Sequence, residues 1–182
     1  MQWSISGFFP AIAMASHVSA DRNHQTGRRI PLKMRFDVAM TGRMGMELQP
    51  GKLSEEDKTF ARNAIVTYKS IRPVVQQGDI YRLISPYDRT GCASLMYVAP
   101  EKNRAVFFAF KTEHFVHMSV PFFRMAGLDP VRHYLVTELN VRGKTVPQNG
   151  KCFTGDFLMK NGLNLPLDGE YGSRVLELKT ID

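Results

Sequence analysis

The chain has 182 residues, of which 43% are hydrophobic and 23% charged, a balance typical of a soluble globular protein. This length allows one well-buried core or two small ones. Its apolar runs fall short of the roughly 18 residues that a membrane span needs, so we expect no membrane-spanning segment.

The net charge of +7 suggests nucleic-acid binding, but the distribution of charge does not favour it. Residues 1–78 contain 11 Lys/Arg against 6 Asp/Glu, and residues 79–182 contain 13 against 11. The basic residues are dispersed, and no block of them alternates with aromatic residues. We therefore expect a solvated basic face, or one that meets acidic chain elsewhere, and no nucleic-acid partner.

The cysteines and the first residues indicate in which cellular compartment the protein is expected. Cys92 and Cys152 alone form neither a disulfide framework nor a metal-ligand pattern, and they fit a reducing environment. Segment 8–15 is apolar, as in a secretion signal, but no Lys or Arg precedes Arg22, and a signal begins with a cationic region. We expect a cytoplasmic protein without a signal peptide.

The first 48 residues predict a strand, a loop, a helix and a second strand. Pro10 ends a short helical piece, and residues 11–19 form an apolar strand that leads into a polar loop. Pro31 suits the first turn of a helix. Apolar residues then recur at helical spacing up to Gly42, and 44–48 is a second short strand.

A longer helix follows. Ser54 is followed by three acidic residues, which predicts a capped helix start. Phe60, Ala64, Tyr68 and Ile71 then form one apolar face, and the helix should end near Arg72 and Pro73. Strands and helices in alternation, with apolar strands, indicate a parallel α/β sheet or barrel.

After Gly78 the pattern is β throughout. Short β-rich runs separated by turn signals predict an antiparallel β-sandwich. These runs are 80–85, 93–98, 105–111, 120–126, 134–140, 157–159 and 174–179. The sequence therefore predicts two domains, 1–78 and 79–182. Since two strands cannot close a barrel of eight strand–helix units, we expect residues 1–78 to be the end of a larger domain.

Seven motifs, taken in order, resemble the C-terminal portion of bacterial α-galactosidases of glycoside hydrolase family 36. They are ASHVSA at 15–20, NHQTGR at 23–28, RFDVAM at 35–40, GDIYRL at 78–83, ASLMYV at 93–98, GLDP at 127–130 and TGDFLM at 154–159. The resemblance covers essentially the whole chain.

The resemblance implies the terminal part of a (β/α)8 barrel followed by a β-sandwich. It also implies a retaining enzyme that releases terminal α-1,6-linked galactose from oligosaccharides, with two carboxylates about 5–5.5 Å apart. The family's nucleophile lies in a Lys-Trp-Asp context that is absent here, where the only tryptophan is Trp3. We expect both catalytic aspartates upstream of Met1, no catalytic residue in this chain, and an inactive isolated segment. Asp21 is not assigned as a substitute.

The resemblance places the polar loop at the substrate side of the barrel, and its partners there would be an α-galactoside and the missing N-terminal part of the barrel. Candidate substrate-side residues are His17, Asn23, His24, Gln25 and Arg28. His17 either lines the sugar pocket or is a hydrogen-bonded histidine at a strand end. The loop residues either contact sugar hydroxyls or hold the loop through backbone bonds. We expect no cofactor or metal, and a homo-oligomer at full length.

Further residues have open interpretations. Arg28 and Arg35 can pair with carboxylates near the site, including Asp37, or form structural ion pairs between helices. Phe107, Phe108, Phe110, Phe122 and Phe123 fit a hydrophobic core better than a sugar-stacking platform. The alternative function is a stand-alone β-sandwich, either a carbohydrate-binding or a structural module.

Overall fold

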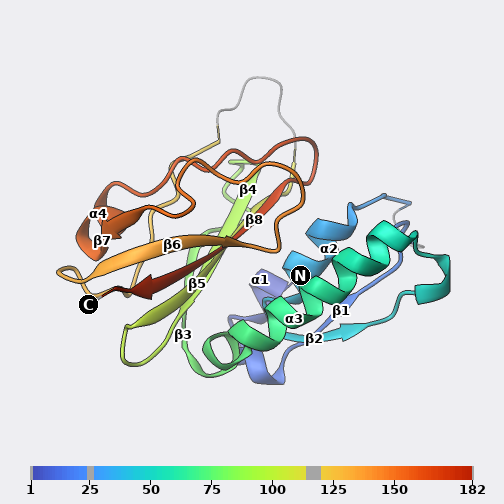
Figure 1. Ribbon diagram of the computed structural model, residues 1–182, viewed down its shortest axis with the longest axis horizontal. Helices are drawn as coiled ribbons and strands as arrows, with labels where there is room; N and C mark the ends of the chain where they lie inside the picture. The colour runs from blue at the N-terminus through green and yellow to red at the C-terminus, as the bar shows by residue number, and fades with distance from the viewer. Residues whose placement is uncertain (1, 24–26, 114–119, 182) are drawn as a thin grey trace.

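The computed structural model describes residues 2–23, 27–113 and 120–181. Figure 1 shows the long helix α3, helix α2 and a two-stranded sheet on one side, with a six-stranded sheet on the other. The two-stranded sheet is parallel, whereas all pairs in the larger sheet, ordered β3-β4-β5-β8-β6-β7, are antiparallel. This change from parallel to antiparallel pairing agrees with the sequence interpretation on either side of Gly78.

The parallel pair is built from two short strands joined through α2. Helix α1 (Gln2–Ile5) and a 3-10 turn (Ala11–Ala13) precede β1 (Ala15–Val18). Helix α2 (Leu32–Ala39) leads to β2 (Arg43–Met46), with His17 opposite Gly45. The predicted strand 11–19 is therefore shorter than expected. Its first residues form turn bonds, Ala13 N–H to Pro10 and Met14 N–H to Ala11, before the chain extends.

A second 3-10 turn (Pro50–Lys52) precedes helix α3 (Glu55–Gln77). The cap is as predicted, since Ser54 Oγ accepts a hydrogen bond from the Asp57 amide at 3.1 Å. The predicted end at Pro73 is wrong, because the helix continues for another turn. A proline removes one helical hydrogen bond, and burial of Val74 and Val75 in the core holds the last turn in place.

The larger sheet contains β3 (Asp79–Ile84), β4 (Cys92–Val98), β5 (Arg104–Lys111), β6 (His133–Leu139), β7 (Cys152–Thr154) and β8 (Ser173–Thr180). Two predicted strands are wrong. Residues 157–159 lie in helix α4 (Gly155–Lys160), because Thr154 Oγ1 accepts from the Phe157 amide and starts a helix. Segment 120–126 forms one bridge, between Phe123 and Leu163, and no named strand.

The central strands β4, β5 and β8 are buried on both faces, with separate hydrophobic clusters on each. One face, with Tyr97 and Phe108, packs against α2 and α3. The other, with Met96 and Phe107, is covered by irregular segments around Phe123 and Leu163. These segments form the second layer of the C-terminal part. Residues 1–78 and 79–182 therefore share one of the two cores.

The phenylalanines predicted to be core residues are buried, with one exception. Phe122 is 63% exposed, whereas the side chain of its neighbour Phe123 is fully buried and packs against Phe107 in the second cluster. In the described residues, no helix combines the length and apolar character required to cross a membrane.

Tyr97 joins the two parts through a buried hydrogen bond, its hydroxyl donating to the Thr41 carbonyl at 2.6 Å. Burial raises the pKa of the Tyr97 phenol well above its usual value, so the donor stays protonated.

Replacing Tyr97 by Phe should lower the free energy of unfolding by about 1–3 kcal/mol, because the Thr41 carbonyl loses the hydroxyl that donates to it in a buried position. Urea denaturation measures this loss. The matched control is Tyr87→Phe, since Tyr87 is 70% exposed, and it should change stability by less than about 0.5 kcal/mol. Equal losses in the two variants would contradict the assignment.

Candidate functional site

A cavity of about 410 Å³ lies where the carboxyl ends of β1 and β2 emerge. Its walls come from the segments after both strands, from α2 and from the start of α3. The lining residues are Ala20, Asp21, Arg35, Glu47, Leu48, Gln49, Lys52, Leu53 and Asp57. In parallel α/β sheets and barrels, ligands bind at this end of the strands. The sequence predicts the functional face at this end of the strands.

His17 lies on the exposed face of β1, across Gly45 of the neighbouring strand. Its Nδ1 is 2.8 Å from Glu47 Oε1, and the two side chains are 45% and 60% exposed. A methyl group at position 45 would lie 2.6 Å from His17 Cδ2, so the missing side chain of Gly45 makes room for the ring. Glu47 lines the cavity and His17 supports it from the adjacent strand. The parallel register brings these residues together.

The loop between β1 and α2 is closed by backbone hydrogen bonds. The Asn23 amide donates to the Arg28 carbonyl, the Gly27 amide to the Asn23 carbonyl, and the Ile30 amide to the Asp21 carbonyl, at 2.8–3.0 Å. Asn23 is half-buried and Arg28 is exposed. Neither lines the cavity. The candidates His24 and Gln25 lie outside the described residues.

Arg35 holds both ends of this loop. Its Nη1 donates to the Ser19 carbonyl at 2.5 Å, and its Nε donates to the Ile30 carbonyl at 2.9 Å. Burial lowers the pKa of the Arg35 guanidinium, while Asp21 and Asp57 oppose that effect. Of the two interpretations left open for Arg35, pairing with Asp37 does not occur, because residues two apart on a helix point in nearly opposite directions. Arg35 is thus a cavity residue that the sequence analysis treated only as an ion-pair candidate.

The cavity carries both signs of charge, with Arg35 and Lys52 against Asp21, Glu47 and Asp57. Such a lining offers donors and acceptors to a hydroxyl-rich ligand without favouring a strongly charged one. Among the described residues, no group of three His, Cys, Asp or Glu side chains is placed to hold a metal ion.

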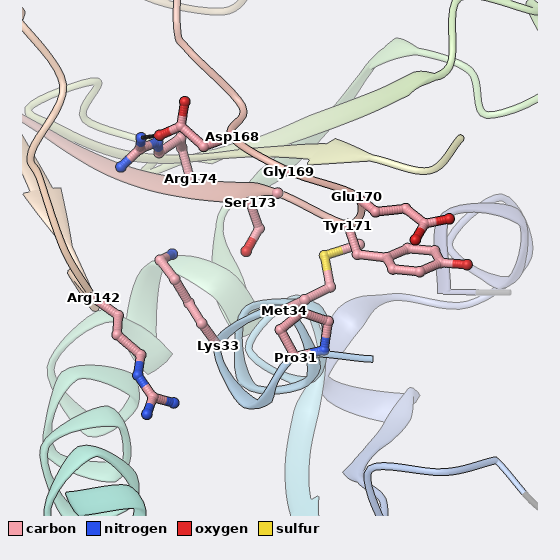
Figure 2. Close-up of a pocket in the computed structure, with 11 residues that line it drawn as sticks. Pro31, Lys33, Met34, Arg142, Asp168, Gly169, Glu170, Tyr171, Ser173 and Arg174 are labelled. Carbon is pink, nitrogen blue, oxygen red and sulfur yellow. Dashed lines mark hydrogen bonds and ion pairs between the residues drawn. The ribbon is translucent and has the colours of Figure 1, made fainter. Parts of the chain in front are cut away.

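A second cavity, of about 290 Å³, lies between α2 and β8. Figure 2 shows Ser173 and Lys33 pointing toward one another across it, with Arg174 beside Asp168 at one end. Arg174 is almost fully buried, and its Nη1 is 2.9 Å from Glu138 Oε1 while its Nη2 is 3.0 Å from Asp168 Oδ2. The polar groups here bind other protein groups, so this cavity belongs to the junction between the two parts.

Substituting Ala at Gly45 should displace the His17 ring and break its contact with Glu47, at a cost of less than about 1 kcal/mol because only one side chain must move. The ¹H–¹³C NMR signals of the His17 imidazole report the change. Gly51→Ala is the control, since a methyl group there meets nothing within 4 Å. Unchanged His17 signals in the Gly45 variant would refute the arrangement.

Two family models match the chain. Residues 1–78 match the model described as "Melibiase", and residues 92–178 match "Glycosyl hydrolase family 36 C-terminal domain". Similar curated proteins include "Alpha-galactosidase C" of Emericella nidulans, 37% identical over 98% of this chain and 22% of its own length. "Alpha-galactosidase AgaA" of Geobacillus stearothermophilus is 34% identical over 100% of this chain and 23% of its own length.

The fold is also similar to solved structures of AgaA from Geobacillus stearothermophilus. A complex with 1-deoxygalactonojirimycin has a TM-score of 0.88 at 32% identity, and a complex with raffinose has 0.87 at 31%. Each match covers 99% of this chain and 24% of the solved chain. The chain spans less than a quarter of the length of these relatives. It belongs to glycoside hydrolase family 36 and corresponds to the C-terminal portion of its α-galactosidases.

Proposed function

We propose that this chain is the C-terminal segment of a retaining α-galactosidase that releases terminal α-galactose from oligosaccharides. The parallel pair β1–β2, with a cavity at its carboxyl ends, is the observation that carries this proposal. The similar AgaA structures contain raffinose or stachyose, which supports an α-galactoside as substrate.

The domain assignment extends the proposal. Residues 1–78 would be the last part of a (β/α)8 barrel, and residues 79–182 the C-terminal β-sandwich domain. One face of the parallel pair packs on helices through Ser16 and Val18, while Ala15 and His17 on the other face are exposed. Parallel sheets are normally covered on both faces. The exposed face therefore fits the interior side of a barrel that further strands would complete.

The roles of the candidate residues follow from this placement. His17 and the loop residues Asn23, His24, Gln25 and Arg28 would form the rim on the substrate side, with Arg35 holding the loop. We place the two catalytic carboxylates outside these 182 residues, so the segment alone would not hydrolyse galactosides. On sequence grounds we further propose that the complete enzyme is a cytoplasmic homo-oligomer.

The alternative of a stand-alone carbohydrate-binding module finds no support in the core. The phenylalanines of β5 that would form a stacking platform, Phe107 and Phe108, are fully buried. The face that carries Phe108 also packs against α2 and α3, so the sheet does not present it to a ligand.

The purified 182-residue chain should hydrolyse an aryl α-galactoside no faster than buffer, because retaining hydrolysis needs a carboxylate pair. A hybrid in which this chain replaces the matching C-terminal residues of AgaA should hydrolyse raffinose. Circular dichroism melting confirms that the hybrid folds. An active isolated chain, or a folded hybrid that binds 1-deoxygalactonojirimycin without hydrolysing raffinose, would contradict the proposal.

In the same hybrid, His17→Ala and Asn23→Ala should each lower kcat/KM for raffinose by about 3- to 10-fold, the cost of one hydrogen bond to substrate. Ser70→Ala, on the exposed surface of α3, is the control and should leave kcat/KM unchanged. Wild-type kinetics in both rim variants would remove these residues from the substrate side.

A further inference from the structure

Helix α2 lies between the two sheets and contacts both β1 and β8. Two of its charged side chains, Arg35 and Asp37, point in nearly opposite directions because they are two residues apart. Arg35 turns to the loop and the cavity, and Asp37 turns to the larger sheet. Helix α2 therefore connects the loop and the cavity on one side to the larger sheet on the other.

The Asp37 carboxylate is fully buried and accepts three hydrogen bonds. Lys33 Nζ and Ser173 Oγ reach Oδ2 at 2.5 and 2.6 Å, and Asn140 Nδ2 reaches Oδ1 at 2.5 Å. In Figure 2, Lys33 and Ser173 converge from α2 and β8 on the same side of the helix. Buried charged groups hold a fixed geometry only when such bonds are satisfied. The sheet thereby fixes the position of α2.

Arg35 transmits that position to the loop. Its two bonds join Ser19, directly after β1, to Ile30, two residues before the start of α2. The loop's own bonds, at Asn23, Gly27 and Ile30, lie between these anchor points. A shift of α2 must therefore move both ends of the loop.

We propose that Asp37 and Arg35 are positioning residues through which the C-terminal antiparallel sheet sets the two ends of the substrate-side loop, residues 19–23 and 27–30. The importance of this linkage for catalysis rests on the proposed function, but the linkage itself does not. Other contacts between the two parts bypass α2. Arg104 Nη2, for example, donates to the Ser70 carbonyl on α3 at 2.9 Å.

Amide hydrogen exchange in the 182-residue chain tests the linkage. Ser173→Ala removes one donor to Asp37 and should raise the exchange rates of the Asn23, Gly27 and Ile30 amides about tenfold. Arg104→Gln breaks the connection that bypasses α2, and it should raise them by less than about twofold. The Ser173 and Arg104 variants are compared at urea concentrations that give them equal free energies of unfolding. The emission of Trp3, the only tryptophan, reports whether the parts remain packed, since its Nε1 donates to the Ser94 carbonyl.

A double-mutant cycle separates transmission through Arg35 from general loosening. Arg35→Met should raise loop exchange by itself, and adding Ser173→Ala should then have no further effect. The proposal would be overturned if the effects of Arg35→Met and Ser173→Ala on loop exchange multiply in the double variant. Equal loop exchange in the Ser173 and Arg104 variants would also overturn it. If Ser173→Ala prevents folding, Asn140→Gly removes a different donor to Asp37 and suits the positive φ of 49° at that position.

Exchange is measured without any galactoside, so a failure of the linkage is distinguishable from a failure of the proposed function. The AgaA hybrid tests the latter through raffinose hydrolysis.

Discussion

The docking of α2 on the larger sheet depends on one negative charge. This is the Asp37 carboxylate, which lies without solvent contact between the helix and the sheet. A buried carboxylate is costly unless it is fully hydrogen-bonded, and here the donors come from α2, from β8 and from the residue after β6. Separating α2 from the sheet would remove two of the three donors, Ser173 and Asn140, and leave only Lys33 of the same helix. This requirement selects one docking of α2 on the sheet, where apolar packing alone would tolerate several.

Around Asp37, hydrophobic and polar interactions have different roles. The apolar residues of α2 and α3 pack against Tyr97 and Phe108, and this burial stabilises the contact between the helices and the sheet. Arg142 adds a connection at the start of α3, pairing with Glu56 and Asp57. Burial disfavours its charge, but the hydrogen bonds to these carboxylates raise the pKa of Arg142 overall. These few polar contacts determine how the helices dock on the sheet, and the buried apolar area stabilises that docking.

Short-range patterns in the sequence predicted those elements that depend mainly on neighbouring residues. The cap at Ser54 and the β-rich runs at β4, β5 and β8 agree with the structure. Predictions failed where distant contacts outweigh a local signal, as at Pro73, or where a cap went unrecognised, as at Thr154. The face of the candidate site followed from strand order. The roles of Arg35 and Asp37 did not, since Ser173 and Asn140 lie more than a hundred residues beyond Asp37 and their approach depends on the complete fold.

The short parallel pair has a consequence for solution behaviour. Each of its strands pairs only with the other among the described residues, so each outer edge presents backbone N–H and C=O groups without a strand partner. Such edges can pair with strands of other molecules, and the exposed Phe8, Phe9 and Ile12 of the same N-terminal part add apolar surface. When these edges are left uncovered, aggregation competes with folding. Neighbouring strands that complete the sheet would then also act as protection against self-association.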